Sequence, residues 1–170
     1  MITPIRITEA RVFRTTKNVK FFDIYVEDSN GTDLVEHSGR STSPPNIRGF
    51  KQWYCHKHQT DNNRVLRGSR LFELFNLSWE RPHWYVFLND KVGALRIPVG
   101  CYHRSLSGLS GSLLVNHAIR DNKYDERKEF NPKVIWEPAF YTPYYFNTNQ
   151  VEVDFFINHG YRDGNEGCNA

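Results

Sequence analysis

Residues Gly93 to His103 read GALRIPVGCYH, and this stretch carries the clearest indication of the fold. Leu95-Arg96-Ile97 alternates apolar and polar residues as a strand does. Pro98-Val99-Gly100 then forms a turn, because proline fixes φ and glycine permits a positive φ. An extended chain resumes over residues 101–105. The stretch therefore predicts a sharp corner between two strands, with His103 directed to one side of a sheet.

Short apolar segments on both sides of this corner have the lengths and spacing of strands. Turn residues separate them at intervals of about 8–12 residues, which is typical of an all-β sandwich or barrel. One helix is predicted, the charged segment 121–130, which ends before Pro132. The predicted strands are 5–13, 19–27, 34–37, 49–58, 64–67, 71–77, 84–88, 101–105 and 113–119, with Gly68-Ser69 as a tight turn and Ser107–Ser112 as a break.

The composition agrees with a single β domain. Aromatic residues make up 15% of the 170 residues, and they fit a pleated, half-buried sheet better than a helix. We expect one domain over residues 1–159 and a disordered tail over 160–170. The first residues lack the apolar region of a signal peptide, and no run reaches the ~20 apolar residues of a membrane span. Because Cys55, Cys101 and Cys168 form no C-x-x-C pair, we expect a reducing, cytoplasmic setting without a membrane partner.

The net charge of +3 is spread along the chain rather than gathered in one segment. Nucleic-acid binding usually needs a basic stripe, so we expect no nucleic-acid partner. A mild positive excess is compatible with an anionic substrate.

Two segments resemble the sequence motifs of the cupin superfamily. Gly93 to His103 closely resembles the second cupin motif, in which a glycine is followed by P-x-G and a histidine. Residues 55–58 (CHKH), followed by Arg64 to Gly68, resemble the first motif, an H-x-H pair before a strand and a glycine turn. Residues 61–63 (DNN) stand where the usual glutamate is found. The resemblance implies an all-β, cupin-type β-barrel (jelly roll) with its working site inside the barrel.

Residues 5–138 resemble the nucleotide-sugar branch of the cupins. Ile47 to Phe50 is similar to the R-G-L-H opening of the dTDP-4-dehydrorhamnose 3,5-epimerases. Ile97 to His103 is similar to their I-P-x-G-x-x-H, and residues 130–138 to their N-D-P and I-x-W-P close. Lys51 stands at the position of that family's catalytic histidine, and Asn131 runs directly into Pro132, without the intervening aspartate.

The chain also resembles the dTDP-sugar 3,4-ketoisomerases. His56-Lys57-His58 is similar to their H-A-H-K, and Tyr124-Asp125-Glu126 to their closing Y-D-E turn. The two resemblances together imply an enzyme that epimerises or isomerises a 4-keto-6-deoxy sugar carried on a nucleotide. They also imply a homodimer and no cofactor.

Histidine chemistry suits such a reaction. Residues i and i+2 of a strand share a face, so His56 and His58 should point together, either into the barrel or out of it. The pKa of histidine lies near working pH, so one of them could remove a proton from the carbon next to the sugar ketone. The predicted catalytic residues are His56, His58, Lys51 and His117, the last of which falls near the epimerase family's catalytic tyrosine position.

Substrate-binding residues follow from the same hypothesis. Arginine binds diphosphate in a bidentate manner, and aromatic rings stack on a nucleotide base. The predicted substrate-binding residues are Arg48, Arg64, Trp53, Tyr102 and His103.

Two alternatives remain open. His56, His58 and His103 could instead hold one divalent transition metal, because three imidazoles suit such an ion and leave positions for substrate. A sugar-binding cupin without catalytic activity is the third hypothesis, which the absence of the epimerase histidine and aspartate supports.

Overall fold

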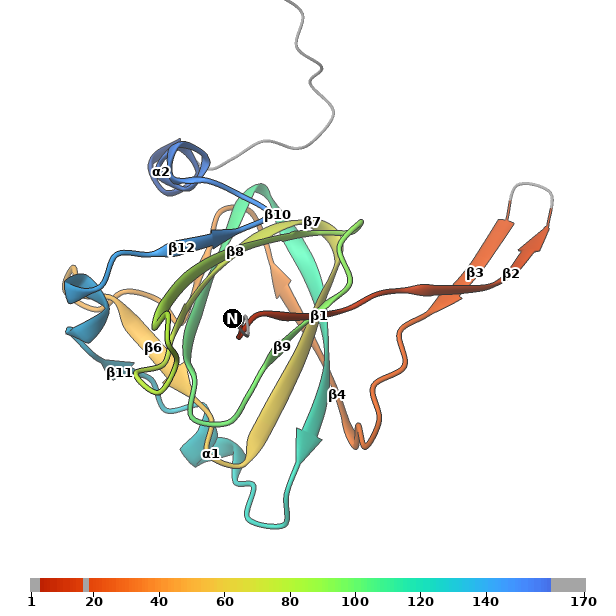
Figure 1. Ribbon diagram of the computed structural model, residues 1–170, viewed down its shortest axis with the longest axis horizontal. Coiled ribbons are helices and arrows are strands. Elements are labelled where there is room, and N and C mark those ends of the chain that lie inside the picture. Colours follow the sequence, from red (N-terminus) through yellow and green to blue (C-terminus); the bar gives the residue numbers. More distant parts are fainter. Residues whose placement is uncertain (1–3, 17–18, 160–170) are drawn as a thin grey trace, which may run out of the picture.

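Two long antiparallel strands, β7 (Gln59–Phe75) and β10 (Tyr102–Arg120), form the frame of the fold (Figure 1). The computed structural model describes residues 4–16 and 19–159. β7 pairs with β10 over most of its length, with β9 (Ala94–Ile97) at its start and with β8 (His83–Asn89) over its second half. Because β7 changes neighbours along its length, the sheet curls around an interior, as Figure 1 shows.

The remaining strands of this ten-stranded sheet extend it at both sides. β1 pairs with β9, and β10 also pairs with β4, β5 and β6. The bounds of these strands are Arg6–Thr8 (β1), Gly31–His37 (β4), Thr42–Ser43 (β5) and Gln52–Cys55 (β6). The all-β, cupin-type architecture expected from the sequence is confirmed.

The predicted corner at Pro98 to Gly100 is present between β9 and β10. Gly100 has a φ of +76°, as the glycine of this turn was expected to have. Its amide donates a hydrogen bond of 2.7 Å to the carbonyl oxygen of His56. The corner therefore joins the His56 segment to the strand that carries His103.

Two predicted interruptions are wrong. Gly68-Ser69 and Ser107–Ser112 lie inside β7 and β10, where the register between the two strands shifts. The glycines lie at an irregularity of the strand pairing, and both strands continue through it without a turn. The predicted segments 64–67 and 71–77 are thus parts of one strand, as are 101–105 and 113–119.

The segment after β10 differs most from the prediction. The helix expected over 121–130 is only the short α1 (Glu126–Glu129), capped by Asp125, whose carboxylate accepts a hydrogen bond from the Arg127 amide. The ten-residue helix α2 (Gln150–His159) was not predicted. Between them lie β11 (Lys133–Val134), η1 (Glu137–Phe140) and β12 (Tyr144–Phe146), of which β11 pairs with β6 and β12 runs parallel to β8.

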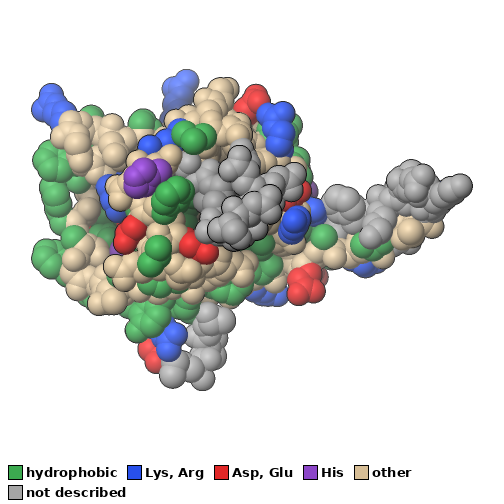
Figure 2. Space-filling model, turned by 90° about the horizontal axis from the view of Figure 1, so that it is seen from above, with side chains coloured by type: hydrophobic (Ala, Val, Ile, Leu, Met, Phe, Trp, Pro, Cys, Tyr) green, Lys and Arg blue, Asp and Glu red, His purple; other side chains and the backbone are tan. Residues whose placement is uncertain are grey.

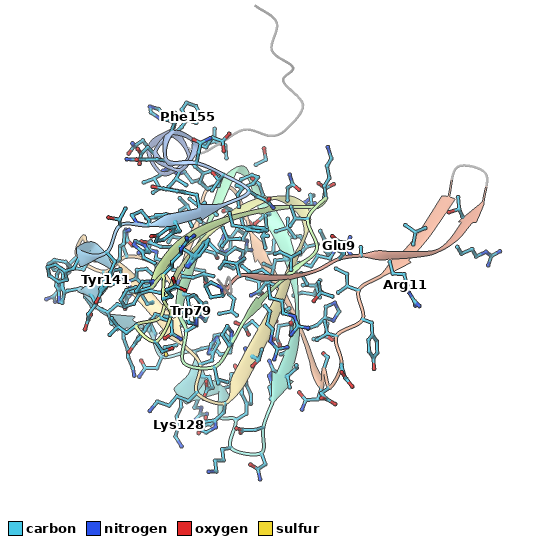
Figure 3. The ribbon with its side chains drawn as sticks, viewed as in Figure 1. Glu9, Arg11, Trp79, Lys128, Tyr141 and Phe155 are labelled. Atoms are coloured by element: carbon cyan, nitrogen blue, oxygen red, sulfur yellow. The ribbon has the colours of Figure 1, made fainter. Side chains whose placement is uncertain are left out.

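Apolar side chains pack on both faces of the sheet. The main core fills the barrel interior and includes Val65, Phe72, Leu74 and Leu95. A second cluster joins Leu71 and Tyr85 on the opposite face of the sheet to Val153 and Phe156 of α2. The segment 133–159 therefore covers part of the outer face of the barrel, with Phe155 on α2 half exposed (Figure 3).

A two-stranded arm projects from the barrel. In the described part of the chain, β2 (Arg11–Thr16) and β3 (Val19–Asp23) pair only with each other (Figure 1). The predicted strand 5–13 is divided between β1 and β2, and the predicted strand 19–27 ends at Asp23. On the face shown in Figure 2, Lys and Arg side chains are interspersed with Asp and Glu. No helix in the described part of the chain is long and apolar enough to cross a membrane. The expected tail 160–170 lies outside the described residues.

Gly111 should be essential to the junction of β4, β7 and β10. Its φ is +75°, and a Cβ there would lie 2.1 Å from the carbonyl oxygen of His37. An alanine at this position would have both a strained positive φ and a steric overlap with the His37 carbonyl oxygen. We therefore expect Gly111→Ala to lower the free energy of unfolding by about 3 kcal/mol, measured by urea denaturation. Gly49 is the control: its φ is +83° but a Cβ would meet nothing within 4 Å, so Gly49→Ala should cost about 1 kcal/mol. Equal losses would contradict the close approach.

Candidate functional site

Two histidines and one aspartate converge inside the barrel. The Nε2 atoms of His56 and His103 each lie 3.6 Å from the same carboxylate oxygen, Oδ2 of Asp61. The two rings are 4.9 Å apart between centroids, and all three side chains are buried. We call these three residues the lumen site.

A backbone carbonyl fixes the orientation of His103. Its Nδ1 lies 3.1 Å from the carbonyl oxygen of Cys101, which can only accept a hydrogen bond, so Nδ1 carries the proton. Burial lowers the pKa of His103 to about 4, an effect that the Asp61 charge opposes and His56 reinforces. His103 is therefore neutral at pH 7, with its unprotonated Nε2 3.6 Å from Oδ2 of Asp61.

The short helix α1 fixes His56 in the same way. The Nδ1 of His56 donates to the carbonyl oxygen of Glu129 at 3.1 Å. The carboxylate of Glu129 is itself buried and accepts a hydrogen bond of 2.7 Å from the amide of Lys57. Glu129, three residues after the Y-D-E segment, thus holds His56 and Lys57 in place.

Neutral amides hold the other oxygen of Asp61. Its Oδ1 accepts hydrogen bonds of 2.7 Å from Gln59 and 2.9 Å from Asn116. These donors do not contact Oδ2, the oxygen that faces the two Nε2 atoms. Asp61 is the functional residue that the sequence did not identify, although it lies in the DNN segment where a cupin glutamate is usual.

A buried guanidinium lines the same cavity. Arg70 donates to Ser112 Oγ (2.7 Å), to the Val35 carbonyl oxygen (2.9 Å) and, more weakly, to Ser105 Oγ (3.4 Å). No carboxylate of the described residues forms an ion pair with it. Burial lowers the pKa of Arg70 to about 10, so it stays positively charged at neutral pH. Asp33 and Asp61 line the same cavity, so Arg70 supplies the positive charge of a cavity that carries both signs.

The cavity around these groups has a volume of about 80 Å³. Tyr54 lies beside it, with its ring 6.1 Å from those of both His56 and His103, and Phe130 packs against His56 at 5.0 Å. Neither aromatic residue was predicted as part of the site. Tyr54 could have been found from strand alternation, since it precedes His56 by two positions.

His58 does not join the site, so the expectation that the H-x-H pair shares a face is wrong. β6 ends at Cys55 and β7 starts at Gln59, so the pair lies in a turn and the alternation of a strand does not apply. His58 is partly exposed, and its Nδ1 lies 2.9 Å from the carboxylate of Asp121. The three-histidine metal set fails for the same reason. The metal-ligating atoms that lie within 4.8 Å of one another belong to His56, Asp61 and His103.

Lys51 and Trp53 also lie away from the lumen site. Between residues 51 and 56, positions 51 and 53 face the outside of the barrel, whereas 54 and 56 face the lumen. Lys51 binds both carboxylate oxygens of Glu73, at 2.9 and 3.0 Å. Glu73 in turn accepts from His83 at 3.1 Å and Tyr85 at 3.0 Å. We call Lys51, Glu73, His83, Tyr85 and Arg104 the outer-face cluster.

Four further predicted residues are not brought to the lumen site. Arg48 is exposed in a loop, with a φ of +48°. Arg64 is buried, and His117 and Tyr102 are partly buried. Arg64 and His117 lie one position along their strands from Asn63 and Asn116, which line the lumen cavity, so both point to the other face.

Searches for related sequences gave no match, either among protein-family models or among curated proteins. Solved structures do match. The sugar 3,4-ketoisomerase QdtA from Thermoanaerobacterium thermosaccharolyticum, in complex with TDP, is 13% identical over 81% of this chain and 92% of that chain, with a TM-score of 0.55. The dTDP sugar isomerase from Desulfovibrio desulfuricans is 17% identical over 83% and 89% of the two chains, with a TM-score of 0.54.

A dTDP-4-dehydrorhamnose 3,5-epimerase also shares the fold. The enzyme from Bacillus anthracis, with TDP and PPi bound, is 11% identical over 78% of each chain, with a TM-score of 0.57. At these identities the likeness establishes a common fold. Both enzyme groups that the sequence resembles are thus represented among its structural neighbours.

Glu73 should make stability depend on pH. Burial alone would raise the pKa of Glu73. The hydrogen bond from His83 and the charge and hydrogen bond of Lys51 lower it by more, so the net shift of the pKa is downward. A carboxyl group with a lowered pKa stabilises the fold fully above its ordinary pKa, and this contribution is lost as the pH falls through the folded-state value. We expect Glu73→Gln to lower the free energy of unfolding by about 3 kcal/mol at pH 7 and by less in acid, measured by urea denaturation.

The control is Glu36→Gln. Glu36 and its partner Arg67 are both more than half exposed, so this variant should change stability by less than about 1 kcal/mol at either pH. A Glu73→Gln loss that grows on acidification would contradict the assignment.

Proposed function

We propose that the chain epimerises or isomerises a nucleotide-linked 4-keto-6-deoxy sugar at the lumen site. The observation that carries the proposal is the convergence of two imidazole lone pairs on one side of a buried cavity. Structural neighbours with the same fold act on dTDP sugars, and one QdtA structure contains TDP-4-keto-6-deoxyglucose. The absence of nucleic-acid and membrane partners, the cytoplasmic setting and the homodimer stay predictions.

His56 is the base in this proposal. Its Nε2 accepts the proton from the carbon next to the ketone, and Asp61, 3.6 Å away, stabilises the imidazolium that forms. The electron pair of the broken C–H bond moves to the ketone oxygen and gives an enolate. Protonation of the same carbon on its opposite face, by a donor or a solvent molecule on that face, completes an epimerisation. In a keto-isomerisation the enolate oxygen instead takes up a proton and becomes a hydroxyl, the hydroxyl on the deprotonated carbon gives up its proton and becomes the new carbonyl, and the former ketone carbon receives the proton from His56.

Arg70 and His103 complete the proposed chemistry. The Arg70 guanidinium has no carboxylate counter-ion among the described residues, so it is suited to stabilise the enolate oxygen. His103 is neutral, with Nε2 facing the same space, and can accept a second proton. The cavity of about 80 Å³ is smaller than the ~300–1,000 Å³ of most ligand pockets, so only the reacting end of the sugar would enter it.

A divalent metal at the lumen site is the second candidate. Three groups favour it, because the two Nε2 atoms and Oδ2 of Asp61 are metal-ligating atoms that all lie within 4.8 Å of one another. Histidines that bind metals usually donate their other ring N–H to a carbonyl or carboxylate, as both do here. His56, Asp61 and His103 would hold the ion, and it would supply a Lewis acid for the sugar carbonyl.

Isotope exchange tests the proposal. Incubation with dTDP-4-keto-6-deoxyglucose in D₂O should place deuterium on a sugar carbon, detected by mass spectrometry. His56→Asn should slow this exchange by about 100-fold or more, because it removes the base. His58→Asn is the matched control from the same H-x-H pair and should leave the rate within about twofold, since His58 lies outside the cavity.

The outcomes separate the hypotheses. Exchange that His58→Asn abolishes and His56→Asn preserves would contradict the assignment of the base. Exchange that a chelator abolishes and one added divalent metal restores supports the second candidate. Thermal stabilisation by the nucleotide sugar without any exchange indicates a sugar-binding cupin that is not an enzyme.

A further inference from the structure

The outer-face cluster lies between two adjoining cavities that the lumen reaction does not use. The first, of about 170 Å³, is lined by side chains that include Arg40, Lys51 and Arg104. The second, of about 270 Å³, is lined mainly by aromatic and apolar side chains. Lys51, Glu73 and Tyr85 line both cavities, so the two meet at the cluster.

Buried polar atoms at this place lack partners. Arg104 is only 7% exposed, and its Nη1 has no hydrogen-bond partner, although Nη2 donates to Asn46 at 2.8 Å. Trp53 is 1% exposed, and its Nε1 is also without a partner. Each unpaired donor in a buried position costs free energy. Both are donors, so an acceptor-rich ligand would satisfy them.

The charge of the first cavity is positive. Arg40, Lys51 and Arg104 carry three cations, and Glu73 supplies one carboxylate. Glu73 is held ionised by its donors, and its Oε2 lies 3.9 Å from Arg104 Nε. The excess of two positive charges matches a phosphate monoester, which carries about −1.5 to −2 at pH 7. Hydroxyl and amide groups of Thr42, Asn46 and Ser105 add donors around the same space.

The second cavity suits a flat ring. Phe50, Trp53 and Trp136 line it, and Phe50 and Trp136 already contact each other edge to face at 5.1 Å. Aromatic side chains of this kind stack on heterocyclic bases. His83 and Tyr85 line it as well, but both donate to Glu73 and so remain fixed. Residues 134–136, 138 and 139 line the second cavity from the segment that follows β10.

We propose that the outer-face cluster is a second ligand site, which binds a nucleoside monophosphate with its phosphate beside Arg104 and Lys51 and its base beside Trp53. Glu73 is the positioning residue, since it holds Lys51, His83 and Tyr85. This site lies on the opposite face of the sheet from His56 and His103, and the inference does not depend on the proposed function of the lumen.

The test is a titration with adenosine 5′-monophosphate, followed by calorimetry and by tryptophan fluorescence. We expect one site per chain and quenching of the fluorescence, because the base stacks near Trp53 and Trp136. Arg104→Gln should weaken binding by roughly 10- to 100-fold, the effect of one charge-assisted hydrogen bond. Inorganic phosphate and adenosine, titrated separately, should each bind more weakly than the nucleotide.

Two further variants keep the test decisive. Lys51 is half exposed, so Lys51→Gln should fold even if Arg104→Gln does not, and it should also weaken binding. Arg67→Gln is the matched control, because Arg67 is exposed, pairs only with the exposed Glu36 in the ion pairs described, and lines neither cavity. Absence of binding at millimolar nucleotide, or equal affinity in the wild type and in the folded variants of Arg104 and Lys51, would overturn the proposal.

Discussion

Two backbone carbonyl oxygens determine what the barrel interior can do. The carbonyls of Glu129 and Cys101 accept the Nδ1–H groups of His56 and His103, and this leaves both Nε2 atoms as acceptors, 3.6 Å from Oδ2 of Asp61. Side-chain partners could rotate or titrate, whereas a carbonyl can only accept. The chemistry of the site therefore depends on where α1 and the corner before β10 place two peptide groups.

Strand alternation then separates this chemistry from that of the outer face. Tyr54 and His56 face the lumen, while Lys51 and Trp53 of the same segment face outward. The segment 133–159 covers part of that outer face through β12 and α2. Glu73, His83 and Tyr85 are buried on this face, whereas Lys51 stays half exposed. One sheet thus carries two polar clusters that share no titratable group.

Much of the fold was predictable, because the GALRIPVGCYH corner combines proline, glycine and alternating residues whose local preferences agree with the final structure. The continuous strands β7 and β10 were not, since glycines at a shift of register resemble glycines at a turn. In the site, His103 was found from the corner itself and His56 from the H-x-H motif. His58 and Lys51 were misplaced, because the strand ends at Cys55 and because spacing alone does not reveal which face is the lumen. Asp61 was overlooked because its role depends on the two histidines that fold against it.

The most direct test of this account is the protonation of the two imidazoles, measured by two-bond ¹⁵N–¹H correlation spectra of ¹⁵N-labelled protein at about pH 8, where an ordinary histidine is neutral. The spectrum of His56→Asn assigns the signals. Protonated Nδ1 and unprotonated Nε2 in both His56 and His103 are the predicted result. A proton on Nε2 of either ring would contradict the account, because that nitrogen could then neither accept a proton from a sugar nor bind a metal.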